Sequence, residues 1–267
     1  MSFVSSSKHN TMKKSNTIIL IHGMFVNNTS WNEWKTFFEA KGYTVYAPAN
    51  PGHEGHPADL RANIHPQLTQ TGFEDVVMNI ARLIDTLPEK PIVIGHSMAG
   101  LVVQKLVEMD KAVAGVSIDG APPKNVMPPF STIKIVWPVI NFFKGNKAYI
   151  GSRDWYNRAF FNTLTEAEKE KAFDAIAVPE SRKIGRDTVL RSFSNVNFKK
   201  AHQPLLFIAG EKDTIFGPAL TRKIASSYKD ANSIVDYKEF KNRSHYIAGE
   251  KGWEEVAGYI ADWIGKL

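Results

Sequence analysis

The sequence predicts an α/β protein built on a doubly wound, mostly parallel sheet. Short continuous apolar runs, typical of strands buried on both faces, alternate along the chain with longer segments whose apolar residues recur at helical spacing. The chain has 267 residues, of which 43% are hydrophobic and 22% are charged. This length and composition are typical of a globular protein with one large core or two small ones.

The alternation of strands and helices begins at residue 17. Residues 17–23 (TIILIHG) are an unbroken apolar run and are predicted as a strand, whereas residues 29–42 carry aromatic side chains at helical spacing and end at a glycine. The same reasoning predicts two further helices, at 73–90 and 100–110. It also predicts three further strands, at 43–49, 91–95 and 113–123.

The alternation breaks from residue 121 to residue 201, where the pattern is helical and irregular and contains no clear strand. It then resumes with strands at 204–213 and 233–242 and helices at 218–230 and 252–267. We therefore expect one core domain made of residues 17–120 and 202–267. Residues 121–201 are expected to form a helical cap or lid inserted between two strands of that core.

Composition excludes several classes of protein. The chain has no cysteine, which rules out disulfides, thiolate metal sites and a cysteine nucleophile. Residues 1–16 are polar and lack the apolar stretch of a signal peptide, so we expect a flexible leader and a cytoplasmic protein. No apolar run approaches the roughly 20 residues of a transmembrane helix. The net charge is +6, but the basic residues are dispersed, so nucleic acid is not an expected partner.

Residues 51–57 (PGHEGHP) place two histidines around a glutamate, which raises the question of a metal site. The glycines and prolines prevent the helix that would bring His53, Glu54 and His56 onto one face. We therefore expect no metal at this loop, and neither a metal nor a cofactor elsewhere in the chain.

Three chemically complementary side chains follow predicted strands. In a sheet of this kind ligands bind at the carboxyl ends of the strands, and Ser97, Asp213 and His245 fall at such ends in that order. A serine hydroxyl is a poor nucleophile unless an imidazole accepts its proton and a carboxylate holds that imidazole in the right tautomer. The small residues Gly95 and Ala99 would allow the sharp strand-to-helix turn that exposes such a serine. The alternative is an ordinary corner serine that caps the following helix.

Four short motifs resemble those of the α/β-hydrolase superfamily, and the resemblance covers residues 17–267 except the insertion. Residues 95–100 (GHSMAG) are similar to its nucleophile elbow G-x-S-x-G, with Ala99 in place of the second glycine. The other three are IHGM (21–24), GEKD (210–213) and SHY (244–246), which resemble its oxyanion segment, acid turn and histidine loop. The resemblance implies a catalytic triad in which Ser97 is the nucleophile, Asp213 the acid and His245 the base.

The same resemblance implies roles for several neighbouring groups. The backbone N–H groups of Met24 and Met98 would form the oxyanion hole, and His22 and His96 would serve in packing and hydrogen bonding. Asp119 also follows a strand, and some superfamily members place the acid at that position. It therefore stays an alternative to Asp213, whose surroundings match the acid turn in full.

Residues 121–153 are the most apolar irregular segment of the chain, and they carry five Lys or Arg and no acidic residue. Over the strand ends they would enclose a dry pocket for an apolar substrate. They could instead serve only to pack the insertion onto the core, or could contact an anionic lipid surface as a peripheral partner.

We therefore expect a carboxylesterase-like serine hydrolase that cleaves carboxylic esters of small to medium apolar compounds through an acyl-enzyme. Alternatives that use the same triad are a lysophospholipase or monoacylglycerol lipase, a lactonase and a carbon–carbon bond hydrolase. An alternative of another class is a ligand receptor on the same fold. The oligomeric state stays open.

Overall fold

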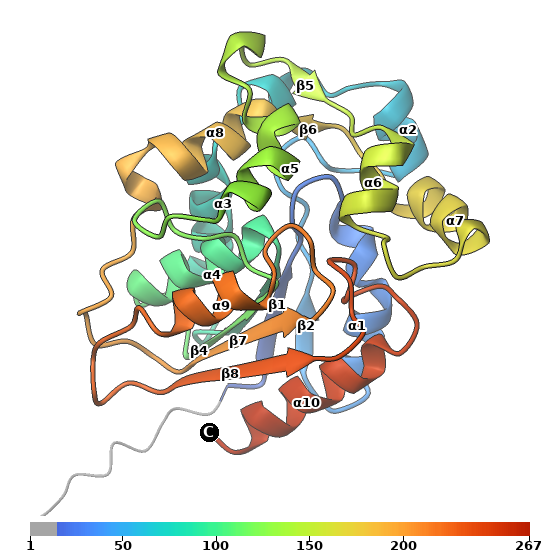
Figure 1. Cartoon of the computed structure of the whole chain (residues 1–267). Coiled ribbons are helices and arrows are strands. Elements are labelled where there is room, and N and C mark those ends of the chain that lie inside the picture. The colour runs from blue at the N-terminus through green and yellow to red at the C-terminus, as the bar shows by residue number, and fades with distance from the viewer. Residues whose placement is uncertain (1–14) are drawn as a thin grey trace, which may run out of the picture.

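The core of the computed structural model, which describes residues 15–267, is a six-stranded sheet in which every neighbouring pair of strands is parallel (Figure 1). The strand order is β2-β1-β3-β4-β7-β8. The strands are β1 (Thr17–Ile21), β2 (Thr44–Tyr46), β3 (Ile92–His96), β4 (Ala114–Ile118), β7 (Leu205–Gly210) and β8 (Val235–Phe240). The doubly wound sheet predicted from the sequence is confirmed, whereas residues 1–14 of the expected leader lie outside the described residues.

Helices cover both faces of the sheet. One face packs against α1 (Asn32–Glu39) and α10 (Trp253–Gly265), and the other against α3 (Phe73–Asp85), α4 (Met98–Glu108) and α9 (Pro218–Ala225). Shorter helical turns link these elements: η1 (Asn28–Trp31), α2 (Pro57–Ala62) and η2 (Pro66–Thr69).

Strand β1 explains why the central runs are apolar at every position. Successive side chains along a strand point to opposite faces, so Ile19 and Ile21 join the cluster formed with α3, α4 and α9, whereas Ile18 and Leu20 join the cluster formed with α1 and α10. Burial on both faces removes the alternation of apolar and polar residues that a half-exposed strand would show.

Residues 121–201 form an insertion between β4 and β7, and its helices lie together in the upper part of Figure 1. It contains α5 (Phe130–Ile140), η3 (Phe142–Lys144), β5 (Ala148–Tyr149), α6 (Arg153–Ala159), α7 (Glu166–Ile176), β6 (Glu180–Ser181), α8 (Arg182–Leu190) and η4 (Ser192–Ser194). The expectation of no strand here was wrong, because β5 and β6 pair as an antiparallel ribbon. Each strand is two residues long, too short for any periodicity to appear in the sequence.

None of the helices among residues 15–267 combines the length and the apolar character needed to cross a bilayer.

Candidate active site

Ser97 occupies the turn between β3 and α4 with a left-handed backbone, at φ +59°. Only a few per cent of non-glycine residues adopt a positive φ, so this turn stores strain. The turn can form because Gly95 and Gly100 have no side chains. A Cβ on Gly95 would lie 2.3 Å from the carbonyl oxygen of Ala99, and a Cβ on Gly100 would lie 2.5 Å from the Cα of Gly120. The side chain of Ser97 is thereby held at the carboxyl edge of the sheet.

The departure from the elbow motif at Ala99 has a simple structural consequence. Ala99 is fully buried within the apolar cluster of α3, α4 and α9. The close approaches that require glycine fall instead at Gly95 and Gly100, which flank it. The additional methyl group of Ala99 is therefore part of the core, and the strand-to-helix turn keeps the glycines that it needs.

His245 lies in the loop that follows β8 and is fully buried beside Ser97. Its Nε2 is 2.9 Å from the Oγ of Ser97, and its Nδ1 is 2.8 Å from Oδ2 of Asp213. An ionised carboxylate can only accept hydrogen bonds, so Nδ1 carries the proton and Nε2 is left as an acceptor for the serine hydroxyl. The three residues predicted from the sequence thus form one continuous chain of hydrogen bonds.

Asp213 is fixed by the turn that follows β7. Its Oδ1 accepts hydrogen bonds from the backbone N–H groups of Ile215 at 2.7 Å and Phe216 at 3.2 Å. Those two bonds orient the carboxylate so that Oδ2 faces the imidazole. The group is ordered before any ligand arrives.

Asp119, the alternative acid, is also buried near the imidazole but is engaged elsewhere. Its Oδ1 accepts a hydrogen bond from the backbone N–H of Gly210 at 2.7 Å, and its Oδ2 has no partner among residues 15–267. Burial and the charge of Asp213 raise the pKa of Asp119 well above its usual value, which favours the neutral form. The hydrogen bond to the imidazole therefore belongs to Asp213.

His96 and His22 have structural contacts. The Nε2–H of His96 donates to the carbonyl oxygen of His245 at 2.7 Å, and Nε2 of His22 accepts from the backbone N–H of Asn50 at 2.9 Å. Burial lowers the pKa of each to about 3, with a further contribution from a neighbouring histidine. Both rings are therefore neutral packing groups at physiological pH.

His96, Asp119 and His245 offer ligand atoms within 4.8 Å of one another, a spacing that a metal ion could bridge. Both ring nitrogens of His245 are already hydrogen-bonded, to Ser97 and Asp213. No lone pair of that ring is free for a metal ion, so the cluster fits a hydrogen-bonded site better than a metal centre.

Met24 and Met98 both line the cavity beside Ser97. Neither of their backbone N–H groups finds a hydrogen-bond acceptor within the described part of the chain. Met98 is the first residue of α4, where unpaired N–H groups carry the positive end of the helix dipole. The loop that carries Met24 can approach Ser97 closely because Gly23 has no side chain. A Cβ at Gly23 would lie only 2.8 Å from the Cβ of Ser97.

Residues of the insertion hydrogen-bond to the backbone of Phe25, next to Met24. Phe25, at φ +67°, donates its N–H to Oε2 of Glu180 at 3.3 Å. Its carbonyl oxygen accepts hydrogen bonds from the Tyr156 hydroxyl at 2.7 Å and from the Val178 N–H at 3.1 Å. The conformation of this loop therefore depends on three groups that are more than 100 residues away in the sequence.

A buried contact between Glu180 and His53 adds to this junction between the insertion and the core. Glu180 is fully buried, and its Oε2 lies 3.3 Å from Nε2 of His53. Burial opposes protonation of His53, but the charges of Glu180 and Glu54 outweigh it and raise the pKa of His53 above its usual value. Among the described residues, His53, Glu54 and His56 do not form a group of three with metal-binding spacing; Glu54 accepts from the N–H of Gly52, and His56 caps α2.

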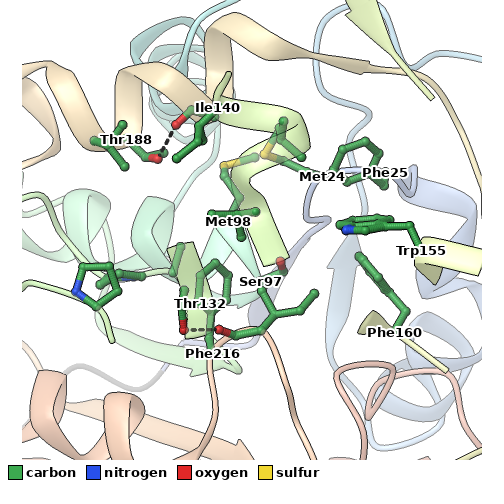
Figure 2. Close-up of a pocket in the computed structure, with 18 residues that line it drawn as sticks. Met24, Phe25, Ser97, Met98, Thr132, Ile140, Trp155, Phe160, Thr188 and Phe216 are labelled. Carbon is green, nitrogen blue, oxygen red and sulfur yellow. Dashed lines mark hydrogen bonds between the residues drawn. The ribbon is translucent and has the colours of Figure 1, made fainter. Parts of the chain in front are cut away.

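An apolar cavity of about 80 Å³ opens beside Ser97, with core and insertion residues around it (Figure 2). The hydroxyls of Thr132 and Thr188 face it but donate to the backbone carbonyls of Ile215 and Gly185. No charged side chain from residues 15–267 lines it. The lining residues are Met24, Phe25, Ser97, Met98, Ala121, Pro122, Pro128, Thr132, Val136, Val139, Ile140, Trp155, Phe160, Gly185, Thr188, Val189, Ile215 and Phe216.

Sequence reasoning missed Phe25, Tyr156, Glu180 and the role of His53. Glu180 stands in the segment AVPES, which has neither periodicity nor a motif. A signal that could have drawn attention to His53 was a histidine in a loop rich in glycine and proline, which we interpreted only as a rejected metal ligand. The pairing of Glu180 with His53 depends on how the insertion folds back, so no local pattern predicts it.

Comparison with models of protein families identifies the family of this chain. A model of the alpha/beta hydrolase family matches residues 18–258, and the chain belongs to that family. No protein in a search of curated proteins matches it.

Solved structures share the fold at low sequence identity. The chain is similar to a monoacylglycerol lipase of Paleococcus ferrophilus, at 20% identity and a TM-score of 0.68 over 95% of this chain and 96% of that one. An extracellular alpha/beta-hydrolase from a Paenibacillus species gives 19% identity and a TM-score of 0.69, over 92% and 98%. A pyrethroid hydrolase from Sphingobium faniae gives 18% and 0.63, over 95% and 98%. At such identities the likeness shows the fold alone.

Proposed function

We propose that this protein is a serine hydrolase that cleaves carboxylic esters of small to medium apolar compounds. The observation that carries the proposal is the continuous chain of hydrogen bonds from Asp213 through His245 to Ser97, at the edge of an apolar cavity. The family membership supports it independently. Residues 121–201 act as the cap of this enzyme.

In the proposed reaction, the Oγ of Ser97 attacks the ester carbonyl while Nε2 of His245 accepts the hydroxyl proton. Asp213 stabilises the resulting imidazolium and holds its ring in place. The carbonyl oxygen becomes negatively charged and accepts hydrogen bonds from the N–H groups of Met24 and Met98, whose positions cost no reorganisation when the charge forms.

The alcohol leaves with the proton carried by His245, and the acyl group stays on Ser97 as an ester. A water molecule then attacks this acyl-enzyme, with His245 acting again as the base, and the carboxylic acid is released. Because the cavity has no charged side chain and its two threonine hydroxyls already donate to backbone carbonyls, it favours an uncharged, apolar acyl or alcohol group.

Covalent labelling tests the nucleophile directly. A fluorophosphonate should phosphonylate Ser97 in the folded protein, and peptide mass spectrometry should locate the adduct there. Ser97→Ala should abolish labelling, and His245→Ala should slow it strongly because the hydroxyl then lacks a base. An adduct on another serine, or none at all, would refute the assignment.

A series of aryl esters of increasing acyl length tests the substrate class. The ratio kcat/KM should rise with the first few methylene groups, each worth up to about 0.8 kcal/mol of burial, and fall when the chain exceeds the cavity. Thr132→Val should leave this profile almost unchanged, because its hydroxyl donates to Ile215 and not to a ligand. A flat profile would contradict selection by the cavity.

A further inference from the structure

The outer surface of the insertion exposes an unusual number of large apolar side chains. Eleven such residues are exposed among residues 15–267, and eight of them lie between positions 127 and 190. The other three, Tyr46, Ile64 and Ile234, lie elsewhere in the sequence. Soluble proteins rarely gather exposed apolar residues in this way unless the surface binds something.

Six of these exposed side chains are hereafter called the apolar face: Met127, Phe130, Trp137, Phe142, Phe143 and Leu190. Phe130 and Trp137 stand two turns apart on α5, so they share one side of that helix. The rings of Trp137 and Phe142 lie 5.9 Å apart. Leu190 ends α8, which packs against α5. Phe143 is 88% exposed, so it contributes little to the fold.

Positive charges accompany the part of the apolar face that belongs to residues 121–153. Lys134 lies between Phe130 and Trp137 on α5, Lys144 follows Phe143 directly, and Lys147 stands three residues further on. All three are exposed and form no ion pair within the described part of the chain, and residues 121–153 contain no acidic residue. Residues 121–153 therefore combine exposed aromatic rings with basic side chains and no acidic one.

We propose that the apolar face docks onto an anionic lipid bilayer. Phenylalanine, tryptophan and methionine side chains partition into the boundary between headgroups and acyl chains, and lysines are attracted to the phosphates there. A second copy of this chain is a poorer occupant, because a two-fold contact through this face would set lysines against lysines.

The apolar face also adjoins the cavity beside Ser97. Thr132, Val136 and Val139 on the opposite side of α5 line that cavity, while Val189 lines it and is itself 37% exposed. The apolar face and the cavity therefore lie on two sides of α5, and Val189, next to Leu190, both lines the cavity and reaches the surface. The docking itself does not depend on the proposed ester hydrolysis, and its test measures binding.

The test is sedimentation of the full chain with large vesicles, one set of phosphatidylcholine alone and one with a quarter phosphatidylglycerol. The protein should sediment with the anionic vesicles and far less with the neutral ones. Triple substitution Lys134→Gln, Lys144→Gln and Lys147→Gln should lower the partition coefficient about a hundred-fold, since each lysine near an anionic surface contributes about five-fold. The matched control substitutes Lys41, Lys229 and Lys266, which are exposed and lie outside the insertion, and should change partitioning little.

The apolar contribution is tested by Phe130→Ser with Phe143→Ser, against Ile64→Ser with Ile234→Ser as the control pair. Only the first pair should abolish sedimentation, and unchanged Tm values would show that all variants are folded. Lipids brominated in the acyl chain should quench tryptophan fluorescence, and Trp137→Phe should remove that quenching, since Trp137 alone of the six tryptophans is exposed.

Several outcomes would overturn the proposal. Equal binding to both kinds of vesicle would refute the role of the lysines, and no binding to either would refute the docking proposal altogether. Loss of binding in the control variants would place the contact elsewhere. Self-association of the wild-type chain that Phe143→Ser abolishes, without vesicle binding, would assign the face to a second copy. Absence of esterase activity with intact vesicle binding would refute only the proposed reaction.

Discussion

Replacing Asp213 by asparagine should disable the proposed triad through the tautomer of His245. The two backbone N–H groups of Ile215 and Phe216 point at Oδ1, so the new amide must place its oxygen there and its NH₂ group toward the imidazole. Nδ1 would then have to accept, the ring proton would move to Nε2, and Nε2 could no longer accept the proton of Ser97. The geometry would be kept while the chemistry is lost.

The expected loss is about 10⁴-fold in kcat, which corresponds to about 5 kcal/mol of activation free energy. Asp119→Asn is the matched control, because it replaces a carboxyl that burial and Asp213 already bias to its neutral form by an isosteric neutral group. It should lower kcat less than about ten-fold. The assay is hydrolysis of a p-nitrophenyl ester under saturating substrate, with circular dichroism to confirm that both variants are folded. If Asp119→Asn proves the more damaging change, the acid role moves to Asp119 and the reasoning from hydrogen bonds fails.

Three further predictions concern the groups that support the site. Glu180→Ala should lower the free energy of unfolding by about 3 kcal/mol, since it leaves His53 without its buried partner. Adding His53→Ala to this variant should lower the free energy of unfolding little further. Additive losses of the two substitutions in urea unfolding would show that the two side chains are not coupled. Gly95→Ala should lower the free energy of unfolding by about 3 kcal/mol, because the new Cβ would meet a backbone oxygen at 2.3 Å. Gly258→Ala on α10 should raise it by about 0.8 kcal/mol, because a Cβ there meets nothing within 4 Å. Equal Tm shifts in the two variants would contradict this. The pKa of His22 is lowered to about 3 by burial and by His53, so unfolding takes up a proton between that pH and the usual value of 6.5, and stability is lost as the pH falls through this window. His22→Gln should therefore reduce the pH slope of the unfolding free energy by about 1.4 kcal/mol per pH unit, and an unchanged slope in denaturant titrations at pH 4.5 to 6 would show that His22 does not titrate on unfolding.

The core of the fold could be predicted because its signals are local. All six predicted strands of the sheet and the five helices that cover it are present, since burial on both faces imposes continuous apolar runs and burial on one side imposes helical spacing. The ribbon of β5 and β6 could not be predicted, because two residues carry no period and their pairing is made across some 30 residues.

The candidate site, too, could be predicted from the sequence only in part. Ser97, Asp213 and His245 could be named from motifs, because each follows a strand and parallel strands bring their carboxyl ends to one edge. The choice between Asp213 and Asp119 stayed open in the sequence, since both follow strands. Only the direction of their hydrogen bonds separates them, one to His245 and the other to Gly210.

By itself the sequence determined the order of strands and helices, the absence of thiol chemistry, and the residues at the strand ends, all of which follow from residue identity and short-range period. Only the tertiary structure decided which carboxylate meets the imidazole, which parts of the insertion hold the loop of Phe25, and which aromatic side chains stay exposed. Those properties depend on contacts between segments far apart in the chain, and the sequence contains no local pattern for them.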